Sequence, residues 1–207
     1  DYLLVDTENP GEKSHQKPAD YIEKIHDALV LGIRDYFVKM GFKQATLGLS
    51  GGIDSALTLA LAVQALGKEN VRVLLMPSKY SSQHSVDDAK ELAENLGIRY
   101  DSINIQNMVD EFENSLAPLF EGTSPGIAEE NIQARTRGIL VMAISNKFGH
   151  ILLNTTNKSE SAVGYGTLYG DMNGGLAVLG DVYKTDVFKM ARFVNRNGEV
   201  IPENYIT

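Results

Sequence analysis

The stretch SGGIDS, which begins at Ser50, combines residue types that can hold the phosphates of a nucleotide. Gly51 and Gly52 allow backbone N–H groups to turn toward an anion without interference from Cβ atoms, and a helix that begins behind them adds partial positive charge. The hydroxyl groups of Ser50 and Ser55 can donate to phosphate oxygens. Asp54 would repel a phosphate unless a divalent cation lay between them, so its presence predicts a Mg²⁺ site.

Other interpretations of this stretch are possible. The spacing G-x-x-x-x-G-K-[ST] of a Walker A loop is absent, no lysine follows the glycines, and G-x-G-x-x-G is not matched either. The plainest interpretation is a strand-to-helix turn in which Asp54 and Ser55 only cap the helix. The rest of the chain makes that interpretation less favoured.

The elements that must position this stretch alternate between strand and helix. Apolar runs typical of buried strands occupy 45–50, 71–76, 98–105 and 150–154. Helical patterns occupy 22–40, 54–66, 86–96, 106–120, 128–147 and 185–195. This alternation predicts an α/β fold with a doubly wound, mostly parallel five-stranded sheet and helices on both faces. Ligands of such sheets gather beyond the carboxyl ends of the strands, which is where SGGIDS falls.

Single residues mark several predicted boundaries. Ser85, with Asp88 three residues later, resembles a capping box and predicts that a helix starts just after it. Pro118 is expected to weaken the end of the helix over 106–120. The dense glycines of 164–180 would let the backbone run close to a flat ligand or a partner chain, although a flexible loop would have the same composition.

Composition excludes several classes of protein. The 207 residues carry 19 basic and 27 acidic side chains, a net charge of −8 that argues against non-specific nucleic-acid binding. An apolar fraction of 43% suits one globular domain. No apolar run is long enough to span a membrane and residues 1–17 lack the pattern of a signal peptide, so we expect a cytoplasmic protein. The absence of cysteine excludes disulfides, cysteine zinc sites and thiol chemistry.

Two further signals are expected to carry no chemistry. The four histidines lack the spacing of metal ligands, and they are His15, His26, His84 and His150. Asn154 and Asn157 begin glycosylation sequons, which we interpret as coincidence because nothing else indicates secretion.

SGGIDS resembles the pyrophosphate loop S-G-G-x-D-S of the ATP-pyrophosphatase family, whose members cleave ATP between the α and β phosphates. NIQARTR at 131–137 and TTNKSESAVGYGTLYGDMNGG at 155–175 resemble the NAD synthetases among them closely, from about residue 20 to the end of the chain. The sequence around the loop is similar to the synthetase half of the glutamine-dependent form, and it reads ALVLGIRDYFVKMGFKQATLGLSGGIDSA. The fold implied is adenine nucleotide alpha-hydrolase-like.

The resemblance implies the residues that contact the co-substrate ATP. They are Ser50, Gly51, Gly52, Asp54, Ser55, Thr155 and Lys184. It also implies that Asp54 and Glu160 hold Mg²⁺ with oxygen ligands and that these two acids act with Lys184 in catalysis. Solvated helix caps remain the alternative for the two acids, and a solvated lysine at a helix start remains the alternative for Lys184.

The positions implied to contact deamido-NAD are Asn131, Arg135, Glu160 and Asp171. Asn131 and Arg135 lie four residues apart, on one face of a helix, and a guanidinium can bind a phosphate through two hydrogen bonds. Arg137, two residues further on, points in another direction and is as consistent with an ordinary surface charge as with a site residue.

The reaction implied is amidation of deamido-NAD to NAD with ammonia, through an adenylate, with ATP converted to AMP and pyrophosphate. The resemblance further implies an upstream glutaminase domain as ammonia source, with 1–18 as the linker from it and 19–207 as a synthetase domain that is incomplete at its C-terminus. We also expect a homo-oligomer, at least a dimer, and neither a nucleic-acid nor a membrane partner.

Two alternatives stay open at this point. One is another ATP-pyrophosphatase, such as a GMP synthetase core or a tRNA-modifying ligase. The absence of cysteine and the acidic charge disfavour tRNA modification, and NIQARTR and NKSES disfavour GMP synthesis. The other is a nucleotide-binding module without turnover, against which the pair Asp54 and Glu160 weighs, because a sensor needs no metal-aligned leaving group.

Overall fold

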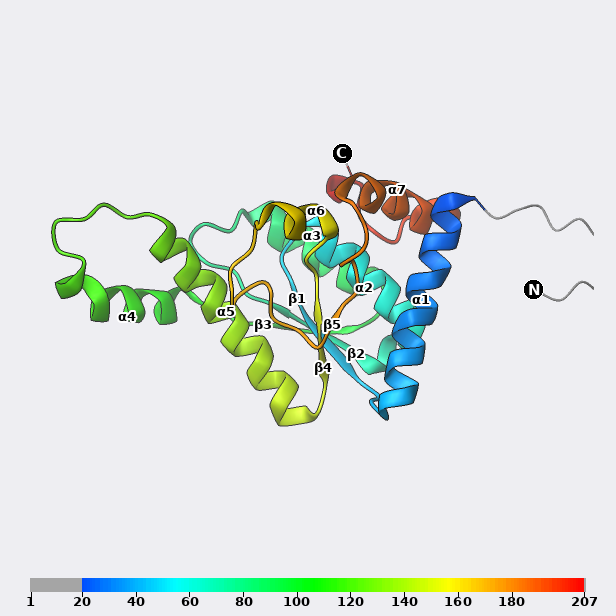
Figure 1. Ribbon diagram of the computed structural model, residues 1–207, viewed down its shortest axis with the longest axis horizontal. Coiled ribbons are helices and arrows are strands. Elements are labelled where there is room, and N and C mark those ends of the chain that lie inside the picture. Colours follow the sequence, from blue (N-terminus) through cyan, green and yellow to red (C-terminus); the bar gives the residue numbers. More distant parts are fainter. Residues whose placement is uncertain (1–19, 207) are drawn as a thin grey trace, which may run out of the picture.

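The computed structural model describes residues 20–206. Its centre is one all-parallel sheet of five strands in the order β3-β2-β1-β4-β5, covered by helices on both faces (Figure 1). The strands are β1 (Ala45–Leu49), β2 (Val71–Leu75), β3 (Arg99–Ser102), β4 (Ile151–Asn154) and β5 (Leu176–Ala177). The predicted fold class is therefore confirmed. The linker predicted over 1–18 lies outside the described residues.

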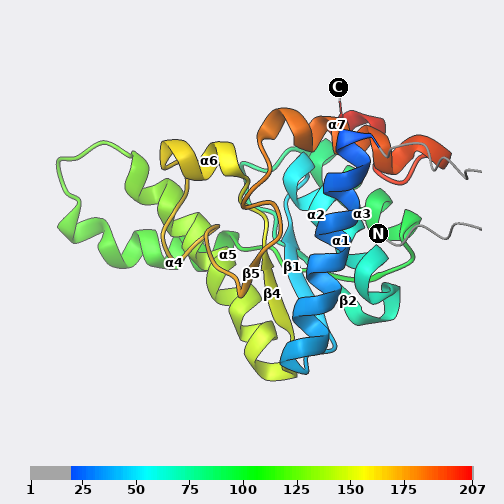
Figure 2. The same cartoon turned by 45° about the vertical axis from the view of Figure 1, so that its right-hand side comes forward.

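Seven α-helices lie within residues 20–206. They are α1 (Tyr21–Met40), α2 (Ile53–Leu66), α3 (Gln83–Asn95), α4 (Gln106–Leu116), α5 (Ile127–Phe148), α6 (Lys158–Val163) and α7 (Lys184–Val194). Figures 1 and 2 both place α1, α2 and α7 on the side of the sheet opposite α5, and α4 and α5 project from that other side. No helix in this part of the chain combines the length and the apolar character that crossing a membrane would require.

Two apolar cores hold these layers together. The larger one lies between the sheet and α1, α2, α3 and α7, and α2 has little polar surface because it is enclosed by the sheet and its neighbouring helices. The smaller one joins α4 and α5 to the other face of the sheet and includes Leu74, Val109, Val141 and Leu152. The two cores keep the strand ends in register, so loops that leave the carboxyl edge are held on a rigid support.

Several boundaries differ from the sequence prediction. The predicted helix start at Ser85 is wrong, because Ser82 caps α3 and its Oγ accepts from the Ser85 N–H at 3.1 Å. Both serines offer a capping hydroxyl, and the earlier one adds a further turn to the helix. As expected, α4 stops before Pro118, which lies in a 3₁₀ turn over Ala117–Leu119. The strand predicted over 98–105 is shorter, since only Arg99–Ser102 pairs as β3.

No apolar run in the sequence marks the fifth strand. β5 consists of Leu176–Ala177, pairs with Leu153 and Asn154 of β4, and falls inside the glycine-dense stretch. Such a short strand is held by its neighbour and not by its own propensity. Sequence periodicity therefore could not place it.

Candidate functional site

The loop between β1 and α2 has a backbone that only glycine adopts comfortably. Gly51 has φ +79°, in the left-handed region. A Cβ on Gly51 would lie 2.7 Å from Ser85 Cβ and 2.8 Å from Ser85 O, so the loop also packs directly against the first turn of α3. Both the conformation and the close approach explain why glycine is required at this position.

Hydroxyl groups close this loop on itself. Ser55 Oγ donates to Gly52 O at 2.9 Å and accepts from Ser50 N at 3.3 Å. Ser50 Oγ lies 3.2 Å from Ser55 Oγ, and Ser50 remains exposed while Ser55 is buried. Gly52 caps α2 without a side chain, so no side-chain acceptor serves the N–H groups of the first turn. The N–H of Gly52 donates to Ser50 Oγ at 3.3 Å, but the start of α2 has no side-chain cap, which leaves backbone donors of the kind that bind anions.

Asp54 lies at the meeting point of three helices. Its Oδ1 accepts from Asn157 Nδ2 at 2.9 Å, and its Oδ2 accepts from Lys184 Nζ. The Asp54 side chain is 15% exposed and that of Lys184 is 38% exposed. Residues from α2, from the start of α6 and from the start of α7 are thereby brought together, although they are distant in sequence.

Glu160 belongs to the same cluster. Its Oε2 accepts from Asn157 N at 3.1 Å, and its own N–H donates to Asn157 Oδ1 at 3.0 Å, which forms a reciprocal cap on α6. Burial raises the pKa of Glu160, the Asn157 N–H lowers it, and the charge of Asp54 raises it again. The two predicted acids thus lie within electrostatic reach of each other, with Asn157 hydrogen-bonded to both.

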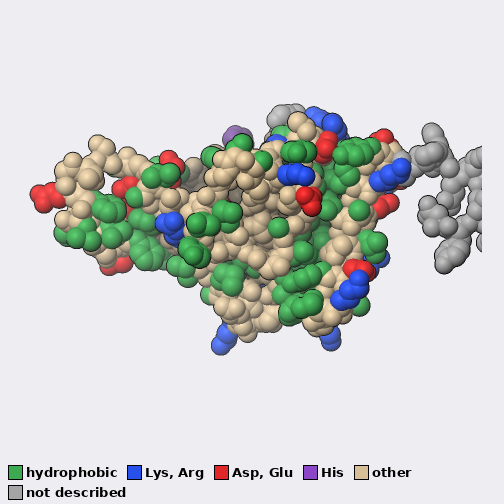
Figure 3. Space-filling view, viewed as in Figure 1, with side chains coloured by type: hydrophobic (Ala, Val, Ile, Leu, Met, Phe, Trp, Pro, Cys, Tyr) green, Lys and Arg blue, Asp and Glu red, His purple; other side chains and the backbone are tan. Residues whose placement is uncertain are grey.

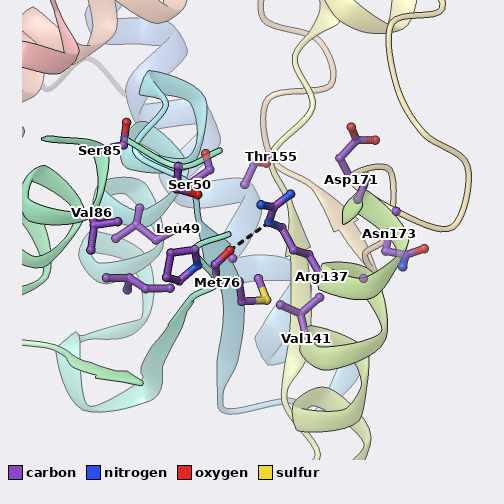
Figure 4. A pocket seen from close by; sticks show the side chains of 18 of the residues that line it. Leu49, Ser50, Met76, Ser85, Val86, Arg137, Val141, Thr155, Asp171 and Asn173 are labelled. Atoms are coloured by element: carbon purple, nitrogen blue, oxygen red, sulfur yellow. Dashed lines mark hydrogen bonds between the residues drawn. The ribbon is translucent and has the colours of Figure 1, made fainter. Parts of the chain in front are cut away.

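A cavity of about 600 Å³ opens beside the loop at the carboxyl edge of the sheet. Three of the predicted residues line it, namely Ser50, Thr155 and Asp171 (Figure 4). Apolar side chains including Met76 and Val141 form another part of its wall, and Met76 is also buried, as expected of a core methionine. A cavity with apolar walls and a few convergent polar groups is the usual form of a small-molecule site.

Arg137 lines the same cavity, which makes its interpretation as an ordinary surface charge wrong (Figure 4). Its Nε donates to Met76 O at 3.1 Å and its Nη2 donates to Ser78 Oγ at 3.5 Å. None of the ion pairs formed within residues 20–206 includes this guanidinium. Burial lowers the pKa of Arg137 from its ordinary value. A partly buried cation with only neutral partners favours an anion in the cavity.

Asn131 and Arg135 do not line this cavity. Asn131 Oδ1 accepts from Thr167 Oγ1 at 2.8 Å, and Arg135 Nε donates to Leu168 O at 3.2 Å. Asp171 Oδ1 accepts from Thr167 N at 2.6 Å. The bonds of Asn131 and Arg135 fasten the glycine-dense segment to α5, and that of Asp171 lies within the segment. The predicted role of Asn131 and Arg135 in ligand binding stays a prediction.

The glycines of that segment serve its packing on the chain itself. A Cβ on Gly170 would lie 3.0 Å from Ala134 Cβ on α5. Gly174, with φ +149°, would place a Cβ 2.7 Å from Asn154 N at the end of β4. Close approach to neighbouring elements, rather than a loop without structure, therefore explains these two glycines.

Sequence reasoning missed Asn157 and left the role of Arg137 undecided. For Asn157 a signal was available, because Asn followed by Glu160 three residues later is typical of a helix start. For Arg137 the sequence could not decide between a site residue and a surface charge, because the direction of its side chain depends on how α5 packs against the sheet. Within residues 20–206 no group of three or more metal-ligating acids or histidines occurs, so a cation site here would rest on Asp54 and Glu160 alone.

Comparison with known proteins gives a consistent result. The NAD synthase family model matches residues 25–207. A glutamine-dependent NAD(+) synthetase from Synechocystis sp. is 54% identical over 206 residues, which is 100% of this chain and 37% of the relative. The structure of a glutamine-dependent NAD+ synthetase from Acinetobacter baumannii in complex with ADP has a TM-score of 0.92 and 47% identity, covering 98% of this chain and 39% of that one.

A shorter structural neighbour also matches. An NH3-dependent NAD synthetase from Campylobacter jejuni has a TM-score of 0.80 and 34% identity, covering 91% of this chain and 77% of that one. The chain spans 37% of the length of the Synechocystis relative but most of the Campylobacter neighbour.

Proposed function

The chain belongs to the NAD synthase family, and from this premise we propose that it carries the site at which deamido-NAD is amidated to NAD. In this proposal ATP activates the substrate and is converted to AMP and pyrophosphate, and ammonia supplies the amide nitrogen. The observation that carries the proposal is the junction of the SGGIDS loop, with its free backbone donors, and the Asp54, Lys184 and Asn157 cluster.

We infer that the ATP phosphates lie on the loop at the N-terminus of α2. Ser50 and Arg137 line one cavity, and the N-terminus of α2 with Asp54 lies next to it in the chain, so negative charge would be met from several sides. Thr155 lines the cavity and would contact the same nucleotide. The Acinetobacter relative of known structure binds ADP, which supports a nucleotide in this place.

Asp54 and Glu160 have the donor chemistry for Mg²⁺. Mg²⁺ is usually held by one or two protein carboxylates together with phosphate oxygens and water, and Asp54 and Glu160 would supply two carboxylates. Each Asp54 oxygen accepts one hydrogen bond in the structure, so each keeps a further lone pair. When bound there, Mg²⁺ would neutralise charge on the phosphates.

The proposed chemistry runs in two steps. The carboxylate of deamido-NAD attacks the α-phosphorus of ATP, and pyrophosphate leaves with the electrons of the broken P–O bond. Ammonia then attacks the acyl carbon of the adenylate, loses a proton, and AMP leaves with the electrons of the C–O bond. No covalent bond to the protein is needed, because the task is to align two anions and to neutralise the charge that develops.

The residues of this chain would divide that task. Lys184 lies beside the loop, so its ammonium would neutralise charge on the departing pyrophosphate. The amide donors of α2 would hold the phosphates in line for attack. Asp171 lines the cavity with Oδ1 held by Thr167, and we propose that it, Asn131 and Arg135 contact deamido-NAD.

Partners are also part of the proposal. The relatives named glutamine-dependent are longer than this chain, and we propose that a glutaminase domain supplies ammonia in the whole protein, with the activity in the cytoplasm. We further propose a homodimer. Exposed apolar side chains on the α4–α5 projection, Phe112, Leu119 and Ile127, favour a second copy as its cover, and several hydrophobic side chains gather there in Figure 3.

The test is to incubate the protein with deamido-NAD, ATP, Mg²⁺ and ammonium. Equal amounts of AMP and NAD are expected. Nucleotide binding without AMP would instead favour a module without turnover, and AMP formation only with a different acceptor, such as xanthosine monophosphate, would favour another ATP-pyrophosphatase. Glutamine in place of ammonium, added to the full-length protein, tests the proposed ammonia source.

A further inference from the structure

Asn157 forms an unusual set of bonds for a residue at a helix start. It is 0% exposed. Its Oδ1 accepts from Glu160 N, its N–H donates to Glu160 Oε2, and its Nδ2 donates to Asp54 Oδ1 at 2.9 Å. One side chain therefore contacts an acid on α2 while its own helix turn holds a second acid.

We propose that Asn157 is a positioning residue that holds Asp54 and Glu160 in one arrangement before substrate binds. This inference rests on the proposed function and adds a residue to it. Asn157 touches neither substrate nor reacting atoms in this account, and it acts only through the two acids and through the turn that it begins.

The orientation of the Asn157 amide follows from its partners. The Glu160 N–H can only donate, so the amide oxygen must face it. The amide nitrogen is then left facing Asp54, where it meets an acceptor. Because the reciprocal cap with Glu160 holds the amide in this direction, the position of the Asp54 carboxylate is set by the start of α6.

The same turn also places the lysine. Ser159 Oγ accepts from Lys184 N at 3.0 Å, and Lys158 N donates to Val182 O at 2.9 Å. The start of α7 is thereby tied to the start of α6. One four-residue turn at the start of α6 therefore fixes the positions of Asp54, Glu160 and Lys184, which belong to three helices.

Capping alone does not explain asparagine at this position. A cap needs only an oxygen acceptor, and Ser, Thr or Asp would supply it. Next to a carboxylate with 15% exposure, however, Asp would add a third negative charge beside two acids, and Ser would leave Asp54 Oδ1 without its donor. Asparagine supplies an acceptor for the helix and a donor for Asp54 in one planar group.

The experiment compares Asn157→Ser and Asn157→Asp in the full-length protein. Both variants keep an oxygen for the cap, and Asn157→Asp also keeps the shape. We would measure kcat, the KM values for ATP and deamido-NAD, the thermal midpoint, and Mn²⁺ binding in the presence of a non-hydrolysable ATP analogue by electron paramagnetic resonance.

We expect kcat and Mn²⁺ affinity of Asn157→Ser to fall by about tenfold to a hundredfold, as for other residues that orient metal ligands. The KM for deamido-NAD should change less than kcat, because Asn131, Arg135 and Asp171 form no hydrogen bond with Asn157 in residues 20–206. Asn157→Asp should lose more than Asn157→Ser, because it places a carboxylate against Asp54.

The matched control is Asn104→Ser. Asn104 Oδ1 accepts from Gln106 N at 2.8 Å near the start of α4, so it has a similar backbone bond but no hydrogen bond to an acid of residues 20–206. The proposal would be overturned if Asn157→Ser kept its kcat and Mn²⁺ affinity, or lost no more of them than Asn104→Ser does. It would also be overturned if Asn157→Asp had a higher kcat and Mn²⁺ affinity than Asn157→Ser. If Asn157→Ser does not fold, Asn157→Asp alone decides through Mn²⁺ affinity. A wild-type protein that binds Mn²⁺ and nucleotide but forms no NAD would reject the proposed function separately.

Discussion

The two ends of the parallel strands both carry a shielded arginine, and the two arginines differ in what neutralises them. At the amino edge, Arg72 Nε donates to Asp101 Oδ2 at 2.7 Å, and its guanidinium lies 5.0 Å from the centre of the Phe148 ring. At the carboxyl edge, the hydrogen bonds that Arg137 donates within residues 20–206 go to a backbone carbonyl and a serine hydroxyl. A cation that already has a carboxylate stabilises the fold, whereas one with neutral partners is available to an incoming anion.

Both edges also have a cavity, of about 350 Å³ at the amino edge and about 600 Å³ at the carboxyl edge. His150 lines the smaller one, and burial together with the charges of Arg72 and Arg99 lowers its pKa. The larger one adjoins the loop with free backbone donors. The presence of a cavity and of a positive charge therefore does not distinguish the two edges. They differ in whether the arginine is paired with a carboxylate.

The largest effect is expected at the carboxyl edge, and it is measured by comparing one substitution at each edge. Asp54→Asn removes the charge that faces Lys184 and the proposed Mg²⁺, and we expect kcat to fall by about 10²- to 10³-fold. Steady-state release of AMP measures it. Asp101→Asn is the matched control and should leave kcat within about twofold. Equal losses in both variants would break the contrast between the edges.

The next effect concerns Arg137. Arg137→Met should raise the KM for ATP by about tenfold to a hundredfold, because a charge-assisted bond of about 1.5–3 kcal/mol is lost. The free energy of unfolding of the ligand-free protein should stay equal or rise, because a shielded cation without a carboxylate is removed. Arg137→Lys should recover part of the affinity for ATP. A clear loss of folding stability with unchanged KM would place Arg137 among the structural residues, beside Arg72.

Gly51→Ala should lower the free energy of unfolding by about 1–3 kcal/mol, since φ +79° and the 2.7 Å approach to Ser85 Cβ are both incompatible with a side chain. Denaturant titration measures it. Gly52→Ala is the control, because its φ is −96° and the nearest obstacle is Ser50 Oγ at 3.3 Å. If both variants lose the same stability, the left-handed backbone of the loop is not what requires glycine.

The smallest effect is one of stability at the amino edge. The hydrogen bond from Arg72 is the largest cause that lowers the pKa of Asp101. A carboxyl with a lowered pKa stabilises the fold above its unfolded pKa of about 4 and loses that contribution as the pH falls through its folded pKa. Asp101→Asn should therefore cost about 0.5–1 kcal/mol at pH 7, a small value because Asp101 is partly exposed.

Denaturant titrations of both proteins between pH 2 and 7 check this prediction. The difference between wild type and Asp101→Asn should shrink below about pH 4 as the wild-type carboxylate becomes protonated. A difference that is constant over this range would mean that the charge of Asp101 contributes nothing to the fold.

Much of the fold and part of the site could be predicted because they depend on local interactions. The alternation of apolar strand runs and helical patterns gave four of the five strands, and the short β5 was missed because its pairing with β4 holds it in place. The cap at Ser82 was missed because two serines in similar positions compete, and only the packing of α3 decides between them. The SGGIDS loop was predicted because its backbone conformation depends on residues that are adjacent in sequence.

By itself, the sequence determined that loop, its glycine with a left-handed backbone, and the order of strands and helices that delivers it to one edge of a sheet. The tertiary structure decided which side chains meet there. Asn157 and Asp54 are 103 residues apart in sequence, and Arg137 enters the cavity only because α5 packs against β1 and β4. Backbone conformation follows from neighbours along the chain, but the partner of a charge depends on contacts between elements that no local pattern records.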